Sequence, residues 1–222
     1  MGNSSPAPCI RRATTGDAAE LARLRWGFSN ELIGPLEFRP LTPERWPDLE
    51  TLFGPRGACA GCWCMWWRLP HSQFERQRGE ENRRALKGLV DAGQAPGILA
   101  YAEGRLVAWC SLGPREAFPT LERSRILKRV DEQAVWSVVC FYVARGWRRK
   151  GIMVPLLVAA VEYAREHGAR IVEGYPIEPR GQTASASLYT GLASAFRKAG
   201  FVEVARRSET RSIMRYAMQD EN

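Results

Sequence analysis

The stretch Val138–Met153 reads V-V-C-F-Y-V-A-R-G-W-R-R-K-G-I-M, an apolar run of strand character followed by a basic turn that contains glycine. An apolar segment with helical character, Val154–His167, follows at once. A strand that enters a helix through such a turn presents backbone N–H groups at the helix N-terminus, an environment that binds anions. Arg148, Arg149 and Lys150 add positive side chains at the same place. The stretch therefore predicts a strand, a phosphate-binding turn and a helix in succession.

The segments around this stretch continue the pattern of strands and helices. Trp136–Val143 is expected to be a central strand, and Ala169–Pro176 is expected to be the next one. The Ala- and Ser-rich segment Ser185–Ala199 predicts a further helix, and Gly200 is suited to cap its C-terminus. The other predicted elements are a helix at Arg76–Ala92 and a hairpin of Ile98–Ala102 with Leu106–Leu112. An excursion with helical character follows at Phe118–Arg129, and the last two strands are expected at Phe201–Arg206 and Ile213–Tyr216.

The spacing Arg148-x-x-Gly151-x-Met153 resembles the acetyl-CoA signature of the GNAT superfamily, the acyl-CoA-dependent N-acyltransferases, whose pattern is Gln/Arg-x-x-Gly-x-Gly/Ala. The run F-R-K-A-G-F that begins at Phe196 is similar to the superfamily's Tyr-x-x-x-Gly-Phe close. The resemblance extends from Leu36 to the C-terminus. It implies an α/β fold with a mixed central sheet of about seven strands, helices on both faces and a splayed pair of parallel strands.

The resemblance implies acetyl-CoA, or another acyl-CoA, as co-substrate and a primary amine, on a small molecule or a peptide, as acceptor. Backbone groups of Phe141 and Val143 would bind the pantetheine, which fills the gap between the splayed strands, and would polarise the thioester carbonyl. The amine would then attack the thioester directly in a ternary complex. By the same resemblance, the pyrophosphate would be held by the turn residues Arg148, Arg149, Lys150, Gly151, Ile152 and Met153.

Two residues depart from the superfamily's pattern. Met153 stands where a small residue is usual, and its side chain would crowd a bound pyrophosphate unless it turned inward. Phe196 stands where members often carry a tyrosine that acts as general acid, and phenylalanine has no proton to donate. These departures keep a second interpretation open, in which the domain binds CoA as a sensor or interaction module.

An acceptor amine must lose a proton before it can attack, so the site needs a base. Glu173 is the first candidate, because it lies in the second splayed strand and shares a face with Ile171 and Tyr175. An ion pair with one of the many arginines is the alternative role for this carboxylate. Tyr189 is the candidate acid, since it would lie two helical turns before Phe196 on nearly the same helix face. Simple packing is the alternative for its ring.

The segment Cys59-x-x-Cys62-x-Cys64, with His71 nearby, offers three thiols and an imidazole, a set that zinc binds in a tetrahedron. No second Cys-x-x-Cys pair is present in the sequence, and the Met and Trp residues between the thiols are typical of a packed core. We therefore assign no metal to the site. Cys140 could carry an acyl group, although a cysteine in a central strand usually packs.

The aromatic segment around these cysteines falls where members of the superfamily vary with their substrate. It is therefore a candidate wall of the acceptor pocket, and specificity for the amine would depend on it. The candidate substrate-binding residues are Trp63, Trp66, Trp67, Arg68 and Tyr175.

Two segments compete for the first strand and helix of the domain. Ile10–Asp17 followed by an amphipathic run has the right pattern, and so has Glu37–Glu44, where Thr-Pro forms a strong helix start. The second segment connects more economically to the next predicted elements of the chain. We therefore expect an N-terminal extension over residues 1–35 and an acyltransferase domain over residues 36–222. The extension would add an edge strand or pack against a second subunit in a homodimer.

The 222 residues carry 32 basic and 24 acidic side chains, which gives a net charge of +8. The excess is scattered along the chain, which argues against a nucleic-acid surface and makes an RNA-linked transferase or binder the weaker alternative. No apolar run approaches the ~20 residues that span a bilayer, and the first residues, M-G-N-S-S-P-A-P, lack the apolar core of a signal peptide. The sequence therefore predicts a cytoplasmic protein without a membrane segment.

Overall fold

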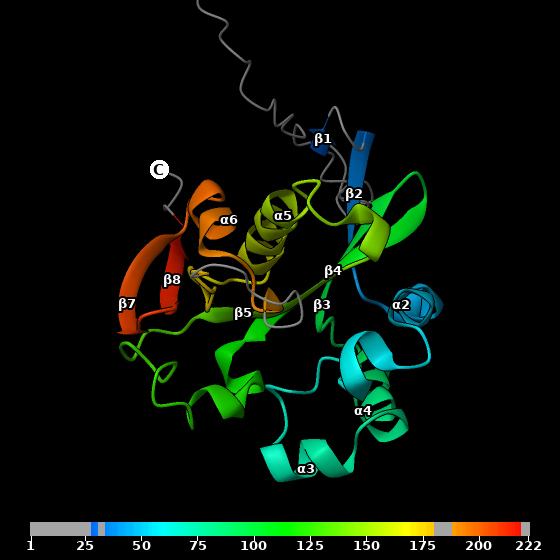
Figure 1. Ribbon diagram of the computed structural model, residues 1–222, viewed down its shortest axis with the longest axis horizontal. Helices are drawn as coiled ribbons and strands as arrows, with labels where there is room; N and C mark the ends of the chain where they lie inside the picture. Colours follow the sequence, from blue (N-terminus) through cyan, green and yellow to red (C-terminus); the bar gives the residue numbers. More distant parts are fainter. Residues whose placement is uncertain (1–27, 31–33, 180–187, 219–222) are drawn as a thin grey trace, which may run out of the picture.

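The computed structural model describes residues 28–30, 34–179 and 188–218. A sheet of eight strands, in the order β1-β2-β3-β4-β5-β6-β8-β7, runs through this part of the chain (Figure 1). Neighbouring strands are antiparallel except β5 and β6, which are parallel. The strands are β1 (Phe28–Asn30), β2 (Gly34–Pro40), β3 (Gly97–Ala102), β4 (Arg105–Pro114), β5 (Trp136–Val143), β6 (Ile171–Gly174), β7 (Val202–Ser208) and β8 (Arg211–Ala217).

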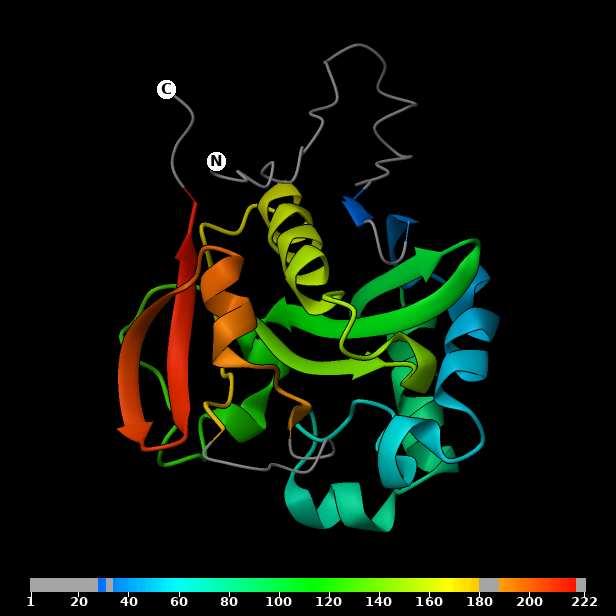
Figure 2. The ribbon, with the colours of Figure 1, turned by 45° about the horizontal axis from the view of Figure 1, so that its top comes forward.

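Helices cover both faces of the sheet (Figure 2). Because successive side chains of a strand alternate between faces, Ile98 and Cys110 join one core cluster, with α5 and α6, whereas Leu99 and Trp109 join another, with α2 and α4. No helix in the described ranges is long and apolar enough to cross a membrane. The helices are α2 (Trp46–Phe53), α3 (His71–Arg76), α4 (Glu80–Asp91), α5 (Met153–Glu166) and α6 (Ala193–Lys198).

The predicted architecture is confirmed, with a mixed sheet, helices on both faces and a splayed parallel pair. β5 occupies the predicted residues, and the predicted hairpin forms β3 and β4. β5 and β6 pair only where Trp136–Val138 lies opposite Val172–Gly174. β5 then continues to Val143, whereas β6 ends at Gly174, so the two strands separate toward their C-terminal ends. This separation positions the candidate site.

Two predicted helices differ from those observed. Within the described part of Ser185–Ala199, Gly191 has a φ of 91° and Leu192 is extended, so α6 begins only after them. The predicted helix Arg76–Ala92 begins only at Glu80, as α4, and Arg76 is instead the last residue of α3; Gly79, whose φ is 85°, lies between the two helices. Residues with these backbone angles cannot continue a right-handed helix, and glycine adopts positive φ without steric cost. The prediction that Tyr189 lies on a helix is therefore wrong.

The chain at the expected domain boundary forms part of the sheet. β1 pairs with β2 in an antiparallel register that sets Phe28 opposite Leu36. The second candidate opening forms β2, a short helical turn at Pro43–Arg45 and α2, in the expected order. The competing strand and helix at residues 10–26 lie outside the described residues. The division into residues 1–35 and 36–222 stays a prediction.

Candidate active site

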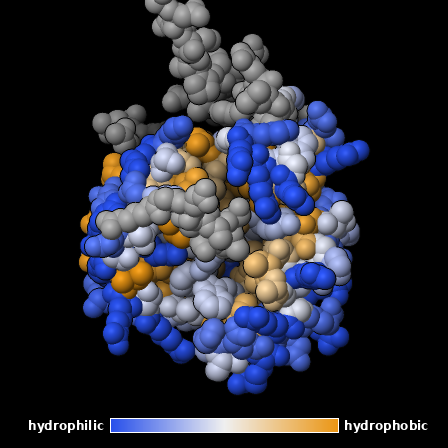
Figure 3. All heavy atoms as spheres, in the orientation of Figure 1, coloured by the Kyte–Doolittle hydropathy of each residue, from blue (hydrophilic) through white to orange (hydrophobic). Residues whose placement is uncertain are grey.

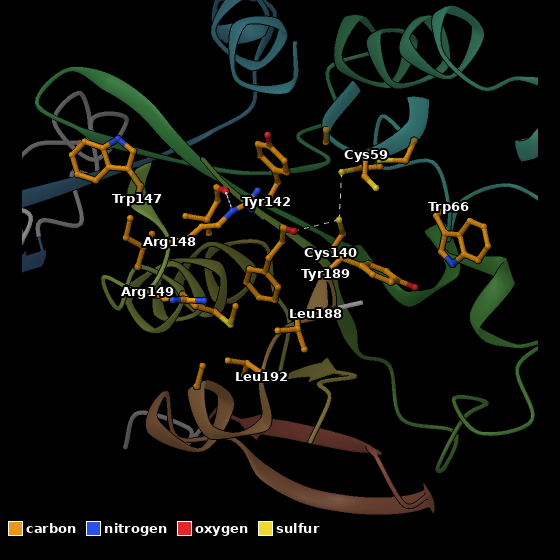
Figure 4. A pocket seen from close by; sticks show the side chains of 18 of the residues that line it. Cys59, Trp66, Cys140, Tyr142, Trp147, Arg148, Arg149, Leu188, Tyr189 and Leu192 are labelled. Carbon is orange, nitrogen blue, oxygen red and sulfur yellow. Dashed lines mark hydrogen bonds between the residues drawn. The ribbon is translucent and has the colours of Figure 1, made fainter. Parts of the chain in front are cut away.

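A cavity of about 810 Å³ opens beside β5 (Figure 4). One end lies at the turn between β5 and α5, and the other lies among aromatic and sulfur-containing side chains. Figure 3 shows hydrophilic residues over much of this face of the molecule, with hydrophobic ones exposed between them near its centre. The described residues that line the cavity are Ala58–Ala60, Cys62, Cys64, Trp66, Trp67, Phe74, Arg78, Cys140–Val143, Trp147–Arg149, Gly151–Val154, Leu188, Tyr189, Leu192, Ser194, Ala195 and Lys198.

The turn between β5 and α5 has a backbone shape that suits anion binding. Arg149 and Gly151 adopt left-handed conformations, with φ of 63° and 80°. Within the described part of the chain, the N–H groups of these two residues have no acceptor. Arg148 donates from Nε to the Val143 carbonyl oxygen over 2.9 Å, which fixes the turn to the end of β5. Backbone N–H groups at the N-terminus of α5 are therefore available to a phosphate.

Five of the six predicted pyrophosphate-binding residues line the cavity, and Lys150 does not. The Lys150 ammonium lies 4.8 Å from the centroid of a Trp147 ring. The Met153 side chain packs against the core cluster under α5, and its sulfur lies beside Gly191. This inward orientation relieves the crowding that a methionine would otherwise cause at the turn. Phe196 is completely buried and packs edge-on against Phe141, with ring centroids 6.0 Å apart.

The amide of Phe141 already has a partner. Its N–H donates to the Tyr189 carbonyl oxygen over 2.6 Å, at the position where the resemblance implied an acyl-CoA oxygen. The segment that contains Tyr189 enters the gap between the splayed strands, where Leu192 forms a bridge with Ile177. An acyl-CoA could use the Phe141 N–H only by displacing the Tyr189 carbonyl.

Tyr189 lies at the end of the cavity with the aromatic and sulfur-containing side chains, here called the acceptor end, although the residue is not helical. Its ring stacks on Trp67 with centroids 6.4 Å apart, and Trp66 lines the same end of the cavity. Burial raises the pKa of Tyr189 to about 12, so the hydroxyl stays protonated at neutral pH. Tyr189, Trp66 and Trp67 thus lie at the same end of the cavity, although Tyr189 is not on the helix that the sequence predicted.

Glu173, the predicted base, does not line the cavity. It is completely buried, and its two carboxylate oxygens accept hydrogen bonds from Arg115 Nη1 over 2.7 Å, Arg215 Nε over 2.7 Å and the Tyr175 hydroxyl over 2.8 Å. Both oxygens of this carboxylate are engaged by donors, so neither is free to accept a proton from an incoming amine. The structure places Glu173 in a structural network instead of at the acceptor site.

Tyr175 belongs to the same network and does not line the cavity either. Its hydroxyl lies 2.6 Å from Arg115 Nη1 and 2.8 Å from the Ser137 hydroxyl, and burial raises its pKa well above the usual value. The network is completed at its edge by Glu122, bound to Arg115, and Asp131, bound to a terminal nitrogen of Arg215. Sequence reasoning missed these partners, because Arg115 and Arg215 lie 58 and 42 residues from Glu173 and share no local pattern with it.

Two of the five predicted substrate-binding residues line the cavity. Trp66 and Trp67 line the cavity, whereas Trp63 is buried in the core with α2 and α4. Arg68 is also outside the lining, and its guanidinium lies 4.4 Å from the centroid of the Phe118 ring. Burial lowers the pKa of Arg68 to about 10. Because Trp63 has a φ of 41°, the segment turns sharply and its rings face in different directions.

Three thiols meet at the acceptor end of the cavity. Cys64 Sγ lies 3.7 Å from Cys140 Sγ and accepts a hydrogen bond from Trp109 Nε1 over 2.8 Å. A hydrogen bond from Cys64 lowers the pKa of Cys62 to about 6, against the opposing effect of burial. In the ranges that the structure describes, no group of His, Cys, Asp and Glu residues is arranged to hold a metal ion. His71 instead packs edge-on against an indole ring of the same segment.

The sequence of the chain matches a known family. The model of the acetyltransferase (GNAT) family matches residues 63–192, more than half of the chain. The chain therefore belongs to the acetyltransferase (GNAT) family, whose members use acyl-CoA and act on amine acceptors. No curated protein is significantly similar to the chain in sequence.

Solved structures of GNAT proteins share the fold. A GNAT-family acetyltransferase from Streptococcus agalactiae has a TM-score of 0.51 and 10% identity, over 85% of this chain and 98% of that chain. One from Listeria monocytogenes has a TM-score of 0.51 and 10% identity, over 83% of this chain and 95% of that chain. The GNAT domain of S. lividans PAT has a TM-score of 0.50 and 15% identity, over 89% of this chain and 98% of that chain. At these identities the likeness concerns the fold.

Proposed function

We propose that this protein transfers an acetyl group from acetyl-CoA to a primary amine, which attacks the thioester directly in a ternary complex. The observation that carries the proposal is one continuous cavity that joins the turn at the N-terminus of α5 to an aromatic end beside β5. The turn residues Arg148, Arg149, Gly151, Ile152 and Met153 would hold the pyrophosphate, with Lys150 nearby as a positive charge. The pantetheine would lie along β5 and bring the thioester to the acceptor end.

The acceptor end favours an amine carried on an apolar or aromatic body. Trp66, Trp67 and Phe74 supply its walls. The described lining contains basic side chains, such as Arg78 and Lys198, but no carboxylate and no imidazole. A polyamine with several positive charges would find no counter-charge there and would lose its hydration without compensation. We therefore propose a small-molecule or peptide amine that is neutral or carries an acidic group.

The backbone of β5 and the side chain of Tyr189 would assist the transfer. The Phe141 N–H, once released from the Tyr189 carbonyl, would stabilise negative charge on the thioester oxygen, and Val143 would bind the pantetheine through its backbone. The Tyr189 hydroxyl would donate a proton to the departing CoA thiolate, because its raised pKa keeps it protonated. Both roles depend on groups that face the same cavity.

Isothermal titration of acetyl-CoA into the full chain tests the proposal. We expect saturable binding in the micromolar range, followed by release of free thiol when a panel of apolar primary amines is added. Thermal shifts with longer acyl-CoAs would rank the acyl group. Absence of binding to every CoA ester would overturn the acyltransferase assignment.

The turn itself is tested by Gly151→Glu, with Gly168→Glu as the matched control. Both glycines have a φ of 80°, so both substitutions strain the backbone alike, but Gly168 follows the C-terminal end of α5 and does not line the cavity. At Gly151 the new carboxylate would also repel the pyrophosphate. We expect on the order of a hundredfold weaker acetyl-CoA binding for Gly151→Glu alone. Equal weakening in both variants would contradict a phosphate site at this turn.

A CoA-binding sensor without catalysis is the second candidate function. Two observations favour it, the occupied Phe141 amide and the burial of Glu173 away from the cavity. Tight acetyl-CoA binding without thiol release for any amine would select this function. The nucleic-acid alternative receives no support, because many arginines are engaged in ion pairs within the chain.

The proposal extends to location and assembly. The five cysteines within the described ranges are free thiols, which fits a reducing compartment such as the cytoplasm. A homodimer that uses the 1–35 extension is the proposed assembly, and light scattering of the full chain against a chain that begins at Phe28, which keeps β1 and β2, would test it.

A further inference from the structure

The thiols at the acceptor end of the cavity are not used by the proposed transfer to an amine. Cys62, Cys64 and Cys140 all line the cavity, although they come from two separate parts of the chain. Cys62 and Cys64 belong to the segment after α2, and Cys140 lies in β5 immediately before Phe141. The cavity therefore carries sulfur nucleophiles next to the strand along which a pantetheine arm would lie.

Hydrogen-bonding contacts hold the three thiols in place. Cys64 Sγ donates to Cys140 Sγ over 3.7 Å, and Cys62 Sγ donates to the Gly57 carbonyl oxygen over 3.4 Å. The Trp109 indole N–H donates to Cys64 Sγ over 2.8 Å and limits its movement. Cys64 is buried, whereas Cys62 and Cys140 are partly exposed to the cavity. Cys62 is thus a partly exposed thiol, two residues before the buried thiol of Cys64.

The groups around Cys62 favour its thiolate. Hydrogen bonding from Cys64 and from backbone groups of the same turn lowers the pKa of Cys62 to about 6, against the opposing effect of burial. The other titratable groups that line this end are Cys59, Cys140, Tyr189 and Arg78, and none of them is a carboxylate. Cys64 has a pKa well above the usual value, mainly because of burial, so it stays a protonated donor. At neutral pH Cys62 is the nucleophile of the cluster.

We propose that Cys62 is an internal acyl acceptor, which takes the acyl group from acyl-CoA when no amine occupies the acceptor end. This inference rests on the proposed acyl-CoA binding and adds a covalent modification site to the same cavity. It assigns no new role to Cys64 beyond positioning Cys62 and supplying its hydrogen bond.

The step is a thioester exchange, and it needs no further reagent. The Cys62 thiolate attacks the thioester carbonyl carbon, a new carbon–sulfur bond forms at Cys62, and the bond to the CoA sulfur breaks. CoA leaves as a thiolate, so charge is conserved and one thioester replaces another. The reverse reaction restores acyl-CoA, and an amine that arrives later can take the acyl group from Cys62 by the same attack on a carbonyl.

The experiment uses acetyl-CoA alone, with the full chain, in a buffer that contains a phosphine reductant but no thiol or amine. Intact-protein mass spectrometry should show the mass of one added acetyl group, and peptide mapping should place it on Cys62. Neutral hydroxylamine should remove it, as it does a thioester. The labelling rate should rise with pH and level off above a midpoint near the Cys62 pKa of about 6.

Variants locate the nucleophile. Cys62→Ser should lower the labelling rate on the order of tenfold or more, because a hydroxyl is far less nucleophilic than a thiolate. Cys110→Ala is the matched control, since this buried thiol lies in β4 and does not line the cavity, and it should label at the original rate. Circular dichroism would establish that both variants fold, and the mapping on the unmodified sequence needs no variant.

Three outcomes would overturn the inference: no label, a label on another residue, or no binding of acetyl-CoA. Acetyl-CoA binding in the calorimeter without any label would leave the acyltransferase proposal intact and remove Cys62 as an acceptor. A label on Cys59 or Cys140, or on a lysine, would assign the modification elsewhere. Failure of acetyl-CoA to bind at all would remove the acyltransferase proposal, and the modification site with it.

Discussion

Two clusters of ionisable side chains meet at β5. They differ in whether their polar atoms already have hydrogen-bond partners within the fold. The carboxylate cluster consists of Glu173, Arg115, Arg215 and Tyr175, and both oxygens of Glu173 are occupied by donors within 2.8 Å. The thiol cluster consists of Cys62, Cys64 and Cys140, and it faces the cavity. The first cluster is closed by its own hydrogen bonds, whereas the second borders the cavity.

The comparison shows why residue type alone misleads. A carboxylate is the usual base for an amine, yet a buried one must be paired to survive desolvation, and the pairing removes it from the site. A thiol is less costly to bury, because it is a small, weakly polar group. It can therefore line an apolar cavity without strong partners and still ionise when a neighbouring thiol donates to it.

The largest effect is expected for Glu173→Gln. The substitution leaves Arg115 and the Nε of Arg215 without their buried counter-charge, which should lower the free energy of unfolding by about 3 kcal/mol or more. Urea denaturation measures the loss. The folded fraction should bind acetyl-CoA within about twofold of the original affinity, because Glu173 does not line the cavity.

The matched control is Glu116→Gln, which breaks an ion pair with Arg129 in which the glutamate side chain is 63% exposed. An exposed pair contributes little, so the change should stay within about 1 kcal/mol. If Glu173→Gln left stability unchanged but abolished thiol release, the assignment of the two clusters would have to be reversed.

An intermediate effect is expected for Cys64→Ala. The substitution removes the hydrogen bond that contributes most to the low pKa of Cys62, so this pKa should rise from about 6 toward that of an ordinary thiol, by about one unit or more. The pH at which iodoacetamide alkylation of Cys62 is half-maximal, followed by peptide mapping, measures the shift.

The sign of this effect depends on the thiolate being the reactive form. A higher pKa means less thiolate at neutral pH, so alkylation at pH 7 should slow while its rate at high pH is retained. Cys110→Ala should leave the midpoint in place. A midpoint that does not move in Cys64→Ala would show that the thiols do not act together, and the contrast with the carboxylate cluster would weaken.

The smallest effect on stability is expected for Tyr189→Phe. The ring and its stacking on Trp67 are kept and only the hydroxyl is lost, so the free energy of unfolding should change by about 1 kcal/mol or less. Acetyl-CoA affinity should be unchanged, whereas transfer to an amine identified by the screen should slow about tenfold if the hydroxyl protonates the leaving thiolate. An unchanged transfer rate, measured by thiol release at several pH values, would leave Tyr189 with a packing role.

Sequence reasoning succeeded where neighbours in sequence are neighbours in space. The strand β5, the turn with Arg148 and Gly151, and the helix α5 form one continuous stretch, so composition and spacing were enough to predict them. The hairpin of β3 and β4 was predicted for the same reason. The helix expected from Ser185 failed, because its Ala-rich composition favours a helix locally but Gly191 and Leu192 adopt other conformations in the fold.

The sequence by itself determined the class of fold and the succession of strand, turn and helix from β5 to α5, because both depend on local propensity and on short spacings. Only the tertiary structure decided what Glu173 and the cysteines do. Arg115 approaches Glu173 across 58 residues, and Cys64 approaches Cys140 across 76. Such contacts are chosen by the packing of whole elements, which decides whether an ionisable group is paired inside the core or left facing a cavity, and no short pattern in the chain records that choice.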